Sequence, residues 1–166
     1  MPVSNRQMPA NHMTNVVRES MPLYERRTNY WKRLSALLAL KEPLREPLDL
    51  LRALDRGLAL SALDSLVRQG YLKTAELAVV APPRTLSHRR AKGERLRPDE
   101  SERLARIGKA IVLAEQVFGD KASALAWLHA PKRKFDGRTP FQLLATAEGG
   151  QLVEEELVSI DEGYVA

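Results

Sequence analysis

The chain has 166 residues, of which 44% are hydrophobic and 28% charged, as expected for one or two small globular domains. It lacks cysteine, which excludes disulfides, thiolate zinc sites and thiol nucleophiles. The net charge is +5, yet the last basic residue is Arg138 and acidic residues dominate from Glu148 on. A basic middle and an acidic end predict two partners of opposite charge, although two solvated faces would explain them equally well. No segment resembles a signal peptide or a membrane span, so we expect a cytoplasmic protein without a membrane partner.

Residues 1–44 are expected to form a flexible arm followed by one helix. Residues 1–22 contain three prolines among polar residues and show no apolar periodicity, which is typical of an arm. A helix is predicted over residues 28–40, with an apolar face made of Trp31, Leu34, Leu37 and Leu38. No stretch of the chain alternates apolar and polar residues as a strand does, so the sequence predicts an all-α fold.

Two further helices are predicted in the next 30 residues. Leucines at helical spacing indicate the first: Leu48, Leu51, Leu54 and Leu58. Ser61 and Asp64 have the spacing of a capping box and should open the second, which Gly70 should end.

Two short helices on either side of a Pro-Pro turn have the dimensions of a helix-turn-helix. They are predicted over residues 74–81 and 84–92, and Gly93 should end the second. The turn departs from the usual pattern, which contains glycine. We therefore expect residues 45–101 to form a DNA-binding helix-turn-helix domain.

The second helix of this pair carries the residue types that read DNA. Thr85, His88, Arg89 and Lys92 are predicted to share one face, with Leu86 turned inward as an anchor. Guanidinium and hydroxyl groups can reach base edges while neighbouring cations neutralise phosphates. A solvated basic helix is the alternative, but Glu94 is the only acidic residue from Arg84 to Arg97. The predicted DNA contacts are Arg84, Thr85, Ser87, His88, Arg89, Arg90, Lys92 and Arg95.

Residues 102–166 are expected to form a second, small helical domain. A long helix should follow Pro98 and end at Gly119, with one apolar stripe made of Leu104, Ile107, Ile111, Ala114 and Phe118. Asp120 should cap a helix through Leu128, and Thr139, Pro140 and Gln142 form a capping box for a helix over 139–146. A last helix is predicted after Gly149-Gly150, with Val153, Leu157 and Ile160 on its apolar face and Gly163 at its end.

Several motifs, taken together, resemble those of the Xre/MbcA/ParS-like antitoxins of bacterial toxin–antitoxin operons. The resemblance covers roughly residues 50–166. Its carboxyl-terminal part consists of Trp127-Leu128 before Pro131, Gly137-x-Thr139-Pro140-x-x-Leu143-Leu144-x-Thr146-x-Glu148-Gly149, Val153 and Gly163-Tyr164-Val165-Ala166. Its amino-terminal part consists of Arg84-Thr85-Leu86-Ser87-His88-Arg89-Arg90, Arg95-Leu96 and Pro98-Asp99-Glu100-Ser101. Each motif is weak alone, and the set is specific.

The resemblance implies an antitoxin with an Xre-type helix-turn-helix and a toxin-binding domain. The implied partner is a RES-domain toxin that consumes or transfers from NAD, and the antitoxin would cover its active site and repress its own operon. Two features depart from the family pattern. Arg97 replaces a capping serine, so the long helix should be capped less well, by about 1 kcal/mol. The basic loop Lys132-Arg133-Lys134 is bulky, and the sequence leaves its role open.

A toxin that handles NAD needs cationic groups for the pyrophosphate, and the acidic end of this chain is complementary to such a site. The end of the chain is therefore expected at or inside the toxin cleft, although a frayed end is the alternative. Trp127 and Tyr164 are the expected anchors, but a lone tryptophan is also a common core residue. The predicted toxin contacts are Trp127, Arg138, Leu144, Glu154, Asp161, Glu162, Tyr164, Val165 and Ala166.

Two other classes of protein remain open from the sequence. A stand-alone helix-turn-helix regulator is the alternative function. An enzyme is disfavoured because no nucleophile–base pair, metal-ligand set or cofactor-binding loop is found, so no catalytic residue, metal or cofactor is predicted. A homodimer is expected because such proteins read two half-sites, with either the 28–40 helix or the 99–118 helix as the contact.

Overall fold

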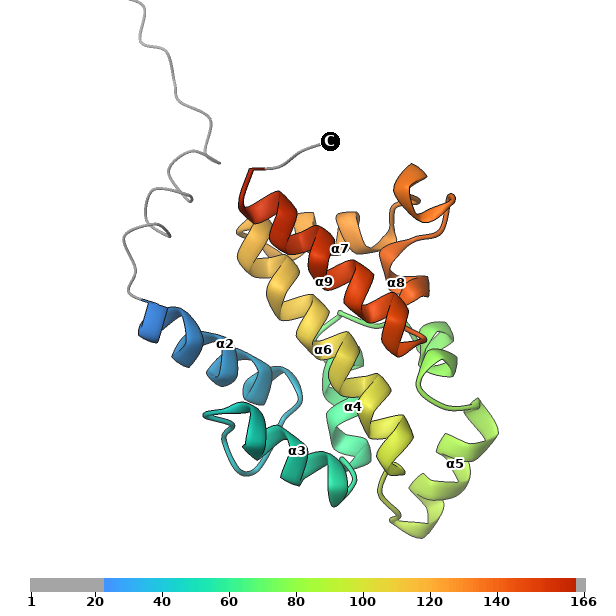
Figure 1. The fold of residues 1–166 in the computed structure, drawn as a ribbon. Coiled ribbons are helices and arrows are strands. Elements are labelled where there is room, and N and C mark those ends of the chain that lie inside the picture. The colour runs from blue at the N-terminus through green and yellow to red at the C-terminus, as the bar shows by residue number, and fades with distance from the viewer. Residues whose placement is uncertain (1–22, 164–166) are drawn as a thin grey trace, which may run out of the picture.

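The computed structural model describes residues 23–163, with side chains from residue 29 on (Figure 1). The elements in chain order are α2 (Leu23–Leu37), α3 (Pro47–Asp55), α4 (Leu60–Arg68), the 3-10 helix η1 (Thr74–Val79), α5 (Pro83–Lys92), α6 (Pro98–Phe118), α7 (Lys121–His129), the 3-10 helix η2 (Arg133–Phe135), α8 (Pro140–Leu143) and α9 (Ala147–Asp161). No strand occurs in residues 23–163, which confirms the all-α fold. Within the same range, no helix combines the length and apolar character needed to cross a membrane.

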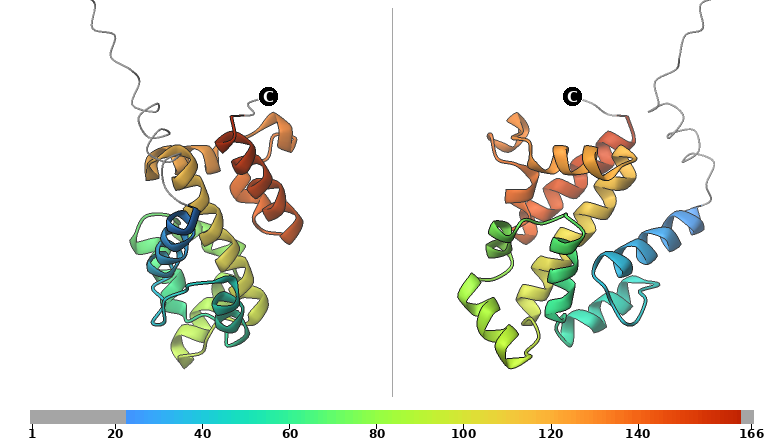
Figure 2. Two further views of the ribbon diagram at one scale, coloured as in Figure 1. Left: turned by 60° about the vertical axis from the view of Figure 1, so that its left-hand side comes forward. Right: turned by 180° about the vertical axis from the view of Figure 1, so that it is seen from behind.

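Helix α6 is the axis of the molecule. It runs through the whole fold, with α2, α3 and α4 along one side, α9 along another and α7 at its end (Figures 1 and 2). Its predicted stripe is confirmed at Leu104, Ile107, Ile111 and Ala114, which are at most 1% exposed, whereas Phe118 is half-buried. Gly119, in the left-handed conformation at φ 85°, ends the helix as expected.

At the beginning of α6, Glu100 supplies part of the cap that a serine at position 97 would have provided. Arg97 makes no side-chain hydrogen bond to the helix, as the sequence predicted. The carboxylate of Glu100 instead accepts a hydrogen bond from the backbone N–H of Arg97, at 2.8 Å. This interaction is the second half of a capping box, so the helix end retains part of its cap.

The predicted apolar face of the first helix is confirmed in α2, whereas the predicted leucine face of α3 and the predicted capping box of α4 are wrong. Trp31, Leu34, Leu37 and Leu38 are buried against the core as expected, although α2 begins earlier than predicted, at Leu23. In α3 the predicted face is wrong, because Leu48 and Leu51 are 46% and 56% exposed and Leu50 is the buried residue.

The correction in α3 has a local cause. The helix ends at Asp55, and the chain turns at Gly57, so Leu58 does not continue the helical face. Leu58 is fixed instead by two backbone hydrogen bonds, from its N–H to the Ser101 hydroxyl and from the Leu96 N–H to its carbonyl. Helix α4 begins after Ala59, and Asp64 bonds to Arg90, so Ser61 and Asp64 form no capping box.

The caps predicted in the last third of the chain are confirmed. Asp120 accepts a hydrogen bond from the N–H of Ser123, at 2.8 Å. Thr139 and Gln142 exchange the two hydrogen bonds of a capping box, at 2.9 and 3.1 Å. Helix α8 is shorter than predicted and ends at Leu143.

Helix α9 begins at Ala147, before Gly149-Gly150, and not after this pair as the sequence suggested. The hydroxyl of Thr146 caps it by accepting a hydrogen bond from the N–H of Gly149, at 3.0 Å. The glycines lie inside the first turn because α9 starts in close contact with α8 and α6. A Cβ atom on Gly149 would lie 2.8 Å from the carbonyl carbon of Leu143 and closer still to its oxygen.

The two halves of the chain share α6 and one hydrophobic core. The predicted boundary between residues 101 and 102 falls inside this helix, so α6 belongs to both halves. His129 of α7 adds a polar link, because its Nε2 lies 2.8 Å from a carboxylate oxygen of Glu76 in η1. Its ring also stacks on Phe141 of α8, with centroids 5.0 Å apart.

Candidate functional site

Helix α5 lies at the end of the molecule opposite α7, α8 and α9 (Figures 1 and 2). Leu86 is 3% exposed and anchors the helix, as predicted. Arg84, Ser87, His88 and Lys92 are exposed. Within residues 29–163, no hydrogen bond or ion pair engages the side chains of Arg84, His88 or Lys92. The helix therefore presents two cations and an imidazole to solvent.

The other predicted DNA contacts on or near α5 are occupied or partly covered. Arg89 is only 7% exposed, and its guanidinium donates to the Glu100 carboxylate and, at 3.2 Å, to the Arg95 carbonyl. Arg89 follows the buried Leu86 by three residues, which turns both side chains inward. The prediction that Arg89 shares the outer face is therefore wrong.

Arg90, Arg95 and Thr85 lie at the margins of this surface. Arg90 pairs with Asp64, and Arg95 donates to the Gly57 carbonyl at 2.7 Å. Thr85 is half-buried. The short helix before the Pro-Pro turn, Thr74–Val79, is a 3-10 helix and not an α-helix.

The predicted toxin contacts fall into three groups. Glu154, Asp161 and Glu162 are exposed along α9, and Arg138 is exposed beside Gly137. Leu144 is completely buried, so its assignment to a contact surface is wrong for this conformation. Tyr164, Val165 and Ala166 lie outside the described residues.

Trp127 is half-buried and packs within the domain. Its ring lies 5.7 Å from that of Phe118, and the ammonium of Lys132 lies 5.2 Å from its centroid. Lys134 of the same loop pairs with Glu156 of α9. The basic loop that the sequence left without a role is thus attached to both α7 and α9.

Two apolar side chains on α9 were missed by the sequence reasoning. Leu152 and Val158 are 48% and 42% exposed. Both lie on the solvent-facing side of α9, where Glu155, at a helical position between them, and Glu162 are also exposed. The signal was present in the sequence, because Leu152 and Val158 are out of phase with the buried Val153 and Leu157.

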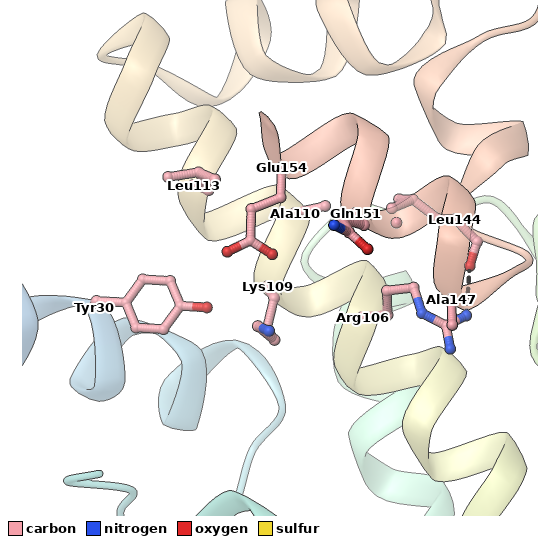
Figure 3. Close-up of a pocket in the computed structure, with 10 residues that line it drawn as sticks. Tyr30, Arg106, Lys109, Ala110, Leu113, Leu144, Ala147, Gln151 and Glu154 are labelled. Carbon is pink, nitrogen blue, oxygen red and sulfur yellow. Dashed lines mark hydrogen bonds between the residues drawn. The ribbon is translucent and has the colours of Figure 1, made fainter. Parts of the chain in front are cut away.

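A groove of about 250 Å³ lies between α2, α6 and α9 (Figure 3). Arg106 and Lys109 come from α6, Tyr30 from α2 and Glu154 from α9. Burial lowers the pKa of Arg106. The pKa of Tyr30 is raised, first by burial and then by the charge of Glu154. Among the described residues, no group of three or more His, Asp or Glu side chains could hold a metal ion.

An exposed basic helix at one end and an acidic, partly apolar helix at the other define a two-part protein with a nucleic-acid-binding unit and a protein-binding unit. Comparison with known families identifies both parts. Residues 49–108 match the antitoxin Xre-like helix-turn-helix domain, and residues 113–163 match the antitoxin Xre/MbcA/ParS C-terminal toxin-binding domain. The two matches meet inside α6.

Two curated relatives support the same assignment. The chain is 39% identical to an antitoxin Xre of Pseudomonas putida over 135 residues, which are 81% of this chain and 84% of that protein. It is 31% identical to an antitoxin Xre of Yersinia enterocolitica over 117 residues, or 69% of this chain and 79% of that protein. The chain belongs to the Xre/MbcA/ParS antitoxin family. The toxin-binding domain distinguishes it from a stand-alone regulator.

Proposed function

We propose that this antitoxin neutralises a RES-domain, NAD-consuming toxin by covering its active site, and that it represses its own operon through DNA. The observation that carries the first part is the outer face of α9, where Leu152 and Val158 are exposed between glutamates. Apolar side chains at the centre of a polar surface are typical of protein interfaces. The glutamates suit the cationic groups that a NAD-binding toxin needs for the pyrophosphate.

The proposed toxin surface consists of the outer face of α9 with Glu154, Asp161 and Glu162, and Arg138 and Trp127 lie at its margin. The proposal extends to Tyr164, Val165 and Ala166 on sequence grounds alone. Leu144 is left out because it is buried.

The variant Leu152→Arg/Val158→Arg is expected to bind the cognate toxin at least about tenfold more weakly and to lose neutralisation. The arginines remove apolar contacts and repel a cationic toxin surface. Affinity should be measured with a purified inactive toxin, and neutralisation by growth and NAD levels in cells that express both proteins. Leu48→Arg/Leu51→Arg is the matched control, because these leucines are equally exposed but lie on α3. Wild-type affinity of the α9 variant would contradict the proposed surface.

For the DNA-binding part, we propose contacts by Arg84, Ser87, His88 and Lys92, with Thr85, Arg90 and Arg95 at the margin. Arg89 is left out because its guanidinium is paired inside the fold. The position of α5 at the end opposite α9 leaves room for DNA and toxin on one antitoxin molecule (Figure 1).

Replacing Arg84 and Lys92 together by alanine is expected to weaken operator binding and flatten its salt dependence. Each cation removed from a phosphate lowers the slope of log K against log salt by about 0.9, so the slope for the double variant should fall by about 2 per protomer. Gel shifts or fluorescence anisotropy at several salt concentrations measure this slope. Arg133→Ala, an exposed arginine at the other end of the molecule, should leave it unchanged. An unaltered slope in the α5 variant would exclude this face as the DNA contact.

A homodimer completes the proposal, because two half-sites are normally read by two copies of the helix. The sequence suggested α2 or α6 as the dimer contact, but neither helix has its apolar face exposed for a second copy. Leu34 and Leu37 of α2 and the following Leu38 are fully buried inside the chain, as are Leu104, Ile107 and Ile111 of α6. A dimer therefore has to use the polar sides of these helices or another surface, and light scattering with and without operator DNA measures its formation.

A further inference from the structure

The groove between α2, α6 and α9 is a feature that the proposed function leaves unused. Its floor is α6, which contributes Arg106 and Lys109 (Figure 3). The Tyr30 ring from α2 closes one side, and the carboxylate of Glu154 from α9 overhangs the middle. Leu113 adds an apolar end. Two cations and one carboxylate therefore line this small space.

The two cations are incompletely satisfied. The Arg106 guanidinium donates to the Leu144 carbonyl at 3.0 Å, and no other hydrogen bond engages it within residues 29–163. Lys109 is half-buried and has no hydrogen-bond or ion-pair partner in the same part of the chain. Arg106 and Lys109 are both half-buried, so water reaches their charges only in part, and burial lowers the pKa of Arg106. An anionic group placed here would gain charge-assisted hydrogen bonds from both side chains.

The groove is continuous with the surface proposed to bind the toxin. Gln151 and Glu154, which form its α9 wall, are neighbours of Leu152 and Glu155 on the outer face of the helix. Most of its lining residues lie within residues 113–163, which match the toxin-binding domain. Helix α5, the proposed DNA contact, lies at the other end of the molecule (Figure 2). The occupant that fits this position is thus a segment of the toxin.

We propose that the toxin inserts an acidic side chain into this groove, where it pairs with Lys109 and Arg106, and that α2 forms part of the toxin interface through Tyr30. The inference rests on the proposed neutralisation of a toxin by this antitoxin. The acidic face of α9 attracts a cationic toxin surface. Within that surface, one carboxylate of the toxin would pair with the two cations of the groove. Opposite charges at two adjacent places fix the register of the complex and disfavour toxins that lack the carboxylate.

The test is the affinity of the full-length antitoxin for its purified, catalytically inactive cognate toxin. Lys109→Glu should weaken binding at least about tenfold, because it replaces an attraction by a repulsion. Lys109→Arg should bind as the wild type does. Lys32→Glu makes the same change of charge on α2, at an exposed residue that does not line the groove, and should have little effect. Operator binding and the unfolding midpoint of Lys109→Glu should match the wild type, which would show that the fold is intact.

A second measurement locates α2. Tyr30→p-benzoylphenylalanine should give a photo-crosslink to the toxin, and the same group at Lys32 should not. Wild-type affinity of Lys109→Glu, together with no crosslink from position 30, would overturn the groove proposal while the α9 variant could still support the proposed function. Failure of the wild-type antitoxin to bind the toxin would overturn the proposed function itself.

Discussion

Replacing Arg89 by alanine is expected to lower the free energy of unfolding by about 3–5 kcal/mol. Arg89 and Glu100 are 7% and 5% exposed, and the guanidinium is the ion-pair partner of the Glu100 carboxylate. The variant leaves this carboxylate buried without its cation, and removal of one member of a buried pair costs far more than the pair contributes. Glu100 also bonds to the backbone of Arg97, so the start of α6 should loosen.

Urea unfolding followed by circular dichroism measures the decrease. Arg90→Ala is the matched control, because Arg90 follows directly in α5 and its pair with Asp64 is at the surface. Such surface pairs contribute about 0–1 kcal/mol, so this variant should remain nearly as stable as the wild type. If Arg89→Ala unfolded like the wild type but failed to bind the operator, Arg89 would be a DNA contact and the burial seen in the structure would not describe the DNA-bound form.

Substitution of both members of the pair gives a further check. Arg89→Met with Glu100→Gln removes both charges and retains a side chain that can bond to the Arg97 N–H. The double variant should be more stable than Arg89→Ala, because apolar or neutral replacements of a buried pair are often well tolerated. Its operator affinity then reports on Arg89 in a folded protein.

The case of Arg89 shows where the sequence reasoning reached its limit. Arginine in a basic helix is normally exposed, and the helical spacing placed Arg89 near both Leu86 and Lys92. Its partner Glu100 belongs to the next helix, and the two meet because the chain turns at Gly93, where φ is 66°. The length and end of α5 were predictable from local signals, whereas the direction of this side chain depended on a tertiary contact.

The difference between local signals and tertiary contacts also explains which other predictions were confirmed and which were wrong. The caps at Asp120 and Thr139 were predicted correctly because a capping residue and its partner are three residues apart. The buried face of α3 was not, because Leu50 is chosen by contact with the core and not by the leucine spacing. Charge asymmetry and the family resemblance predicted toxin contacts at the acidic end of the chain. The exposed Leu152 and Val158 were overlooked, although their helical positions differ from those of the buried Val153 and Leu157.

Gly149→Ala is the second large effect that we expect, with a decrease of about 3 kcal/mol in the free energy of unfolding. The added Cβ would lie 2.9 Å from the Thr146 hydroxyl oxygen, 2.8 Å from the carbonyl carbon of Leu143 and closer still to its oxygen. These neighbours include the backbone of α8 and the cap of α9, which cannot rotate away. Helix α9 must then shift or lose its first turn, so toxin affinity should fall together with stability.

The sign of the change makes this test decisive. In a helix without such neighbours, alanine in place of glycine stabilises by about 1 kcal/mol, so the clash and the helix propensity predict opposite results. Gly150→Ala is the matched control, because its Cβ would meet the Arg106 side chain, with Cγ at 2.9 Å, and a flexible side chain can move aside. This variant should be destabilised much less than Gly149→Ala in the same urea titration. A more stable Gly149→Ala protein would show that α9 does not begin in contact with α8. The placement of α9 and its acidic face against α6 would then be wrong.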